Sequence, residues 1–255
     1  DVVLWVKSLD KMRELRAEFL VPHHSRPIVG SDTVYETLTH YRDAIQFVHD
    51  QTIRWMNMGL SPLEIVERVK LPAHLAAQPY LQEYYGTVAW SVRAIFDGYL
   101  GWFGGNATDL FPLGLEERAN RMARLAGGEN ELHAHARRAM EEKDYPWALE
   151  LSDQVLRLDP MRDEYRKLKA AAMRALGERQ IAATARNYYL TQAMEVEDTL
   201  RIPMMKNTDL ELIHRIPLES IFNGMAVKLN PEKSARVDTI AGFRFPDTGE
   251  AYMVH

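Results

Sequence analysis

The chain has 255 residues, of which 46% are hydrophobic and 26% are charged, as is usual for a folded globular protein. This composition excludes a disordered, collagen-like or low-complexity protein. The net charge of −5 excludes a general electrostatic attraction to nucleic acid, so we expect no nucleic-acid partner. No segment approaches the roughly 18 consecutive apolar residues of a membrane-spanning helix, and no membrane span is expected. The absence of cysteine excludes disulfides, thiolate metal sites and cysteine nucleophiles.

Residues 1–30 are typical of a corner of an α/β domain. Apolar residues at helical spacing predict a short first helix, and the apolar run at 19–21 before Pro22 predicts a buried strand. The loop that follows contains histidines and an arginine at the end of that strand, where α/β proteins place functional residues. Because Asp1 is not an initiator methionine, we expect the chain to be a piece of a longer protein.

Residues 31–200 have the spacing of an almost entirely helical region. Capping boxes that begin at Thr33 and Ser61 predict the starts of two helices. The apolar and aromatic run at 80–103 predicts another helix, in which Gly86, Gly98 and Gly101 indicate close backbone approach. Further helices are expected at about 115–125, 130–142, 145–158, 161–176 and 178–199.

One part of this helical region has the residue spacing of a tetratricopeptide hairpin. Ala148 and Pro160 stand twelve positions apart, as do the small residue and the closing proline in the second helix of such a unit. An ordinary helical hairpin explains the pattern about as well, and no array of repeats follows.

Residues 201–255 change in character. Pro203, Asn207 and Pro217 indicate a linker, and residues 218–225 predict a short helix. Strands are expected at 237–245 and 251–254, on either side of a turn at 247–249. About fifty residues are too few to fold securely alone, so we interpret 208–255 as the truncated start of a small α+β domain.

The histidines are the first candidates for chemistry. His23 and His24 lie in a loop between two prolines, and Arg26 beside them suits an anionic substrate. From spacing alone, solvent-exposed loop histidines are the more common interpretation. His133 and His135 stand two apart on a helix, point to nearly opposite sides and cannot share a metal ion.

The aromatic run at 84–103 has two interpretations. Its side chains either line a hydrophobic channel or form the core and partner face of a helical domain, and core is the more common outcome. No nucleophile elbow, phosphate-binding loop, dinucleotide fingerprint or basic patch is present.

Several strings together resemble the metallo-β-lactamase-fold alkyl sulfatases, zinc enzymes that hydrolyse linear primary alkyl sulfates. They are WVKSLD at 5–10, PHHSRP at 22–27, YRDAI at 41–45, HDQT at 49–52, VKLP at 69–72, YLQEYYGT at 80–87, YLGWF at 99–103, WAL at 147–149 and ARNYY at 185–189. The resemblance implies a mainly α chain. Residues 1–30 would end the hydrolase domain, 31–200 would form an all-helical dimerisation domain, and 208–255 would begin a sterol-carrier-protein-like domain.

The resemblance also implies roles for individual residues. His24 aligns with the last histidine of a binuclear zinc site, whose other ligands are absent from this chain. One histidine cannot hold two zinc ions, so the piece alone is expected to be inactive. Weak candidates for catalysis or for binding the sulfate are Arg26, Tyr84 and Tyr85. The alkyl chain would lie against walls formed by Trp90, Phe96, Tyr99 and Trp102.

Two functional hypotheses follow. The first is the carboxy-terminal portion of a zinc-dependent alkyl sulfatase, which would supply one metal ligand, part of the substrate tunnel and a homodimer interface. The second is a non-catalytic helical module for dimerisation or protein interaction. The half α/β layer that ends in a histidine loop favours the first. The sequence does not indicate a cellular compartment.

Overall fold

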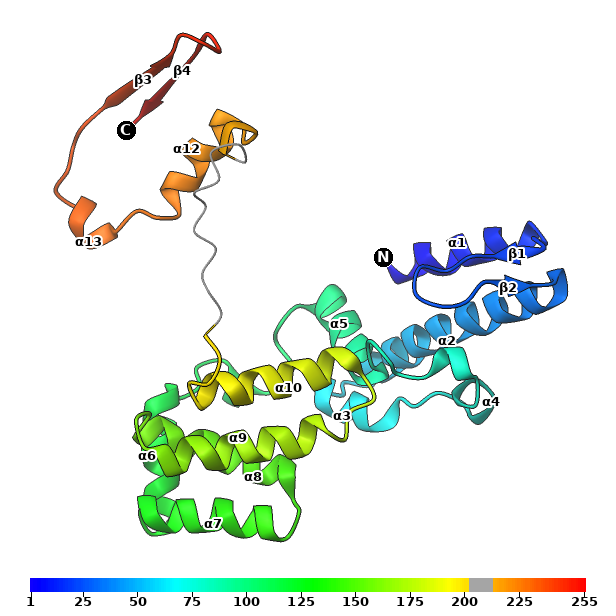
Figure 1. Ribbon diagram of the computed structural model, residues 1–255, viewed down its shortest axis with the longest axis horizontal. Helices are drawn as coiled ribbons and strands as arrows, with labels where there is room; N and C mark the ends of the chain where they lie inside the picture. Colours follow the sequence, from blue (N-terminus) through cyan, green and yellow to red (C-terminus); the bar gives the residue numbers. More distant parts are fainter. Residues whose placement is uncertain (202–212) are drawn as a thin grey trace. The chain divides into compact units, whose positions relative to one another are not determined.

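A computed structural model describes residues 1–201 and 213–255 (Figure 1). The chain divides into two compact units, Asp1–Arg201 and a second unit of which residues 213–255 are described. The fold is mainly helical, as the sequence predicts. Residues 203 and 207 of the expected linker lie outside the described residues. Within the described residues, no helix is both long enough and apolar enough to cross a membrane.

The first unit opens with a helix that packs on a longer one. α1 (Val2–Glu14) lies against the first half of α2 (Ser31–Asn57), and Leu9, Val34 and Leu38 form the buried contact. Asp10 on α1 accepts a hydrogen bond from Arg42 on α2 at 3.1 Å, which adds a charged contact to the apolar one. Between the two helices, β1 (Phe19–Leu20) and β2 (Ile28–Val29) form a short antiparallel hairpin.

A strand forms at Phe19–Leu20 as expected, but the expectation that this strand is buried is wrong. Phe19 and Val21 are 63% and 73% exposed, and only the Leu20 side of the hairpin packs on the helices. The physical reason is that β1 pairs with β2 alone among the described strands, so nothing covers the other side.

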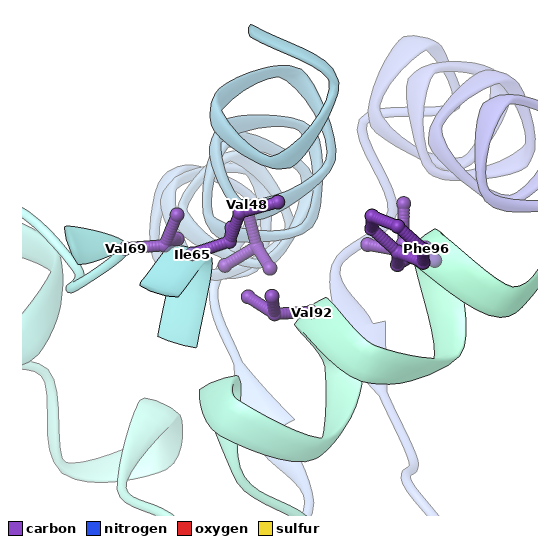
Figure 2. Packing of buried hydrophobic residues seen from close by; sticks show 6 residues of the cluster. Val48, Ile65, Val69, Val92 and Phe96 are labelled. Carbon is purple, nitrogen blue, oxygen red and sulfur yellow. The ribbon is translucent and has the colours of Figure 1, made fainter. Parts of the chain in front are cut away.

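The core of the next region joins three helices. α2 packs against α3 (Pro62–Arg68) and α5 (Val88–Leu100). The connection between α3 and α5 contains α4 (Ala73–Ala76) and the 3₁₀ turn η1 (Pro79–Leu81). Figure 2 shows side chains of this buried cluster: Val48, Ile65, Val69, Val92 and Phe96. The capping box at Ser61 is confirmed, because its hydroxyl and the carboxylate of Glu64 each accept from the other residue's backbone N–H.

Two further expectations are wrong: the helix start at Thr33, and the close backbone approach at the glycines of the run at 80–103. α2 begins at Ser31 after Gly30, whose φ of 103° turns the chain into the helix, so no capping box operates at Thr33. The run at 80–103 is helical only from Val88. A Cβ added at Gly86 or Gly98 would meet no atom within 4 Å, so neither glycine marks a close approach. Gly101 has φ 78° and ends α5.

Five helices complete the first unit, each within five residues of the expected bounds. After the 3₁₀ turn η2 (Ala107–Asp109), successive helices joined by short loops pack on one another. They are α6 (Leu115–Ala126), α7 (Glu129–Glu141), α8 (Tyr145–Leu158), α9 (Asp163–Gly177) and α10 (Ala183–Val196). Ala148 is fully buried between Ala139 and Ala172, which lets α7, α8 and α9 approach closely.

The second unit is small. It contains α12 (Leu218–Ala226), α13 (Pro231–Ser234) and an antiparallel hairpin of β3 (Ala241–Phe245) and β4 (Glu250–Val254). Phe222 on α12 stacks on Tyr252 at 4.5 Å between ring centroids and contacts Phe243 and Phe245. The expected helix and turn are confirmed, but β3 begins at Ala241 and not at residue 237.

Candidate functional site

The loop at 82–87, here called the tyrosine loop, is held at both ends. The Gln82 side-chain amide donates to the carbonyls of Ala76 and Gln78, at 2.7 and 3.0 Å. At the other end, the Glu83 carboxylate accepts from the backbone N–H of Val88 at 2.7 Å, which ties the loop to the first turn of α5. These side chains make the loop a defined structure although it contains no regular element.

Two further hydrogen bonds fix the middle of the tyrosine loop to α10. The carbonyl of Tyr84 accepts from the backbone N–H of Ala183 at 2.8 Å, and the carbonyl of Tyr85 accepts from the hydroxyl of Thr184. The two tyrosine side chains are 60% and 78% exposed. A braced backbone therefore presents two phenols to solvent. Sequence reasoning missed Thr184, whose partner lies 99 positions away.

The aromatic side chains of α5 divide between core and surface. Phe96 is buried in the cluster with Val48 and Val92, so it forms core and not a channel wall. Trp90, Tyr99 and Trp102 are exposed and remain available to a ligand or partner. The Tyr99 hydroxyl lies 2.9 Å from Nε2 of His49 on α2.

A second aromatic group lies where α2 meets η1. Tyr80 stacks on Tyr41 with 5.8 Å between ring centroids, and its hydroxyl lies 2.6 Å from Nδ1 of His40. Burial raises the pKa of Tyr80, so this phenol stays protonated in ordinary conditions. This group anchors the chain immediately before the tyrosine loop.

Residues 99–115, here called the apolar segment, expose large side chains between α5 and α6. Phe111 is 96% exposed and Trp102 is 70% exposed. Other exposed members are Tyr99, Leu100, Leu110, Leu113 and Leu115. So many exposed large apolar groups in one segment make it a candidate interaction surface.

The histidine loop lies between β1 and β2. His23, His24 and Arg26 are all exposed, and the two imidazole rings stand 6.0 Å apart at a tilt of 50°. Among the described residues, no group of three or more histidine, aspartate or glutamate side chains lies close enough together to hold a metal ion. The residues described in this chain therefore do not by themselves form a zinc site.

His133 belongs to a buried network that joins two helices. His133 packs on the buried ring of Tyr165 at 4.9 Å between centroids, and burial lowers the pKa of His133. The Tyr165 hydroxyl donates to Glu129 at 2.6 Å and accepts from Arg162 at 2.9 Å. Burial and the carboxylate of Glu129 raise the pKa of Tyr165 to about 12. This network holds α7 to α9.

A cavity of about 590 Å³ lies among α6, α8, α9 and α10 and contains none of the site residues predicted from the sequence. Asp153 on its wall accepts from both Lys169 and Arg157. Burial raises the pKa of Asp153, but these two cations outweigh burial and hold it below its ordinary value. Asp153, Arg157 and Lys169 are therefore paired with one another.

Comparison with known proteins identifies the class. Residues 61–199 match the family model of alkyl sulfatase dimerisation, which spans more than half of the chain. This protein belongs to the alkyl sulfatase dimerisation family.

Individual relatives extend the match beyond that region. The chain is 42% identical to a linear primary-alkylsulfatase of Pseudomonas sp. (strain ATCC 19151), over 100% of this chain and 50% of the relative. It is 29% identical to an alkyl/aryl-sulfatase of Saccharomyces cerevisiae, over 98% of this chain and 39% of the relative. The solved structure of a stereoselective inverting sec-alkylsulfatase from Pseudomonas sp. superposes with a TM-score of 0.90 and 29% identity, covering 99% of this chain and 40% of that one. The chain thus spans half or less of the length of each.

Proposed function

We propose that this chain is the carboxy-terminal portion of a sulfuric ester hydrolase, which converts linear primary alkyl sulfates and water into alcohols and hydrogen sulfate. The observation that carries the proposal is the match to a linear primary-alkylsulfatase along the whole of this chain. The structural superposition with a sec-alkylsulfatase supports the same reaction class. Within such an enzyme, this chain would contribute substrate contacts, one metal ligand and an assembly surface.

The tyrosine loop is the part of this chain that we assign to the substrate. An alkyl sulfate carries one negative charge spread over three oxygens, and phenol hydroxyls are neutral donors that bind such oxygens. Tyr84 and Tyr85 present their hydroxyls to solvent from a braced backbone, so little backbone freedom is lost when they bind. The exposed rings of Trp90 and Trp102 would contact the alkyl chain.

We further propose that His24 supplies one ligand to the zinc ions of the longer protein. Its imidazole is exposed in a loop that Pro22 and Pro27 restrict, and neutral imidazole is a common zinc ligand. Arg26, two positions on, is a candidate contact for the sulfate. Zinc content is the direct test, because His24→Ala in the longer protein should lower bound zinc while His23→Ala should not.

The apolar segment supports the homodimer. It lies inside the region that matches the dimerisation family, and Phe111 is its most exposed member. Burying one such apolar side chain contributes about 1.5–3 kcal/mol, so several of them together would favour an association. The second copy of this chain is the partner that we assign to this surface.

Activity of the longer protein tests the proposed reaction. Sulfate release from dodecyl sulfate should be measured for the parent protein, for Tyr84→Phe and Tyr85→Phe, and for Tyr188→Phe as a matched exposed control on α10. A lost hydrogen bond to a charged group costs about 1.5–3 kcal/mol, which corresponds to roughly a 10- to 150-fold loss of kcat/KM. Absence of sulfate release from the parent protein would leave the non-catalytic dimerisation module as the better description.

A further inference from the structure

The first unit contains two groups of helices that meet at the tyrosine loop. α2, α3 and α5 share one buried cluster, whereas α6–α10 share others. The hydrogen bonds from Ala183 and Thr184 join these groups, and both end on carbonyls of the tyrosine loop. The candidate substrate loop thus takes its support from the first turn of a helix that belongs to the other group.

We propose that Thr184 is a positioning residue for Tyr85 in alkyl sulfate hydrolysis, an inference that rests on the function proposed above. The Tyr85 side chain is 78% exposed, so no packing in the described chain fixes its direction. The direction of the Cα–Cβ bond is then set by the backbone, and the hydroxyl of Thr184 holds the carbonyl of that residue. Thr184 would act only through Tyr85 and would not touch the substrate.

A substitution at Thr184 can remove the hydrogen bond to Tyr85 without removing the neighbouring one to Tyr84. The bond from Ala183 to the carbonyl of Tyr84 is made by a backbone N–H, and no side-chain substitution deletes it. The bond to Tyr85 depends on one side-chain hydroxyl. Removal of that hydroxyl should therefore leave the loop attached to α10 while freeing the Tyr85 peptide to rotate. Small misplacements of a substrate-contacting group are costly in catalysis, because orientation is part of the rate enhancement.

The experiment uses the longer protein and dodecyl sulfate. Thr184→Val removes the donor at nearly constant volume, and Thr184→Ala does so with less bulk should valine prevent folding. Thr184→Ser keeps the donor. Thr191→Val is the matched control, because Thr191 lies two turns further along α10 and its hydroxyl makes no hydrogen bond within the described part of the chain. Thermal unfolding midpoints should be measured for every variant.

We expect Thr184→Val to lower kcat/KM about tenfold, the size of effect that one lost hydrogen bond gives. Thr184→Ser should restore most of the activity, and Thr191→Val should match the parent. The kinetic parameter that changes, KM or kcat, should be the same one that Tyr85→Phe changes. A merely structural role would lower the unfolding midpoint and would not reproduce this pattern.

A double-mutant cycle separates the inference from the proposed function. If Thr184 acts through Tyr85, then adding Thr184→Val to Tyr85→Phe should lower kcat/KM by less than about twofold. Additive losses, or parent-like kinetics of Thr184→Val beside an impaired Tyr85→Phe, would overturn the inference and leave the proposed function intact. Parent-like kinetics of Tyr85→Phe would overturn both the inference and the role of Tyr85, and parent protein without activity would overturn the proposed function itself.

Discussion

Tyr165→Phe should measurably weaken the contact between α7 and α9. The ring of Tyr165 is fully buried, and its hydroxyl donates to Glu129 and accepts from Arg162. A hydrogen bond to a charged group is worth about 1.5–3 kcal/mol, but Glu129 and Arg162 are 40% and 41% exposed and water can replace the lost partner. We therefore expect a loss at or just below the lower end of this range, about 1–1.5 kcal/mol.

Urea unfolding followed by helical circular dichroism tests this value on the chain itself. The matched control is Tyr188→Phe, because Tyr188 is exposed on α10 and its hydroxyl makes no hydrogen bond within the described residues. The control should change the free energy of unfolding by less than about 0.5 kcal/mol. Equal stabilities of the Tyr165→Phe and Tyr188→Phe variants would refute the idea that the buried network contributes to stability.

Three other outcomes are expected. Burial lowers the pKa of His133, so folding favours the neutral imidazole, and the chain should lose stability as the pH falls below the ordinary pKa of 6.5. His133→Gln should flatten this pH dependence of stability. An unchanged slope in the variant would contradict the role given to His133. Ser61→Ala should cost about 1 kcal/mol in urea unfolding, because it removes the hydroxyl of the capping box, and unaltered stability would count against that role. Phe111→Ser should shift the sedimentation coefficient toward that of the monomer without lowering the unfolding midpoint. Leu125→Ser, at an exposed position on α6, should leave the dimer intact. Identical sedimentation of the two variants would oppose the proposed interface.

The sequence predicts the helices of this chain well because the signals that set them are local. Pro62 after Ser61 and Gly127 after α6 act on their immediate neighbours, and the structure places helix ends beside both. Gly30 shows where local reasoning fails. Its positive φ supplies the turn into α2 without any side-chain cap, so the capping box expected at Thr33 has no helix start to serve.

The candidate site is less accessible to sequence reasoning because its defining contacts are long-range. Tyr84 and Tyr85 stand out as a pair in the sequence, but nothing near them indicates that Ala183 and Thr184 hold their carbonyls. The apolar run around them suggests one continuous helix. In the structure α5 begins only at Val88, after the N-cap Thr87, and the Glu83 carboxylate accepts from the Val88 N–H. Tertiary contacts here override the local preference for helix.

The exposed apolar residues of the first unit have three different explanations under the proposed function. Phe19 in β1 and Val21 directly after it are exposed, whereas Leu20 and Ile28 of the same hairpin pack on the helices. In the proposed enzyme, Phe19 and Val21 would lie against the remainder of the longer protein. Phe111 lies inside the region matched to the dimerisation family, so a second copy is its natural cover. The tyrosine loop is exposed for a third reason, because a residue that binds a substrate must reach it.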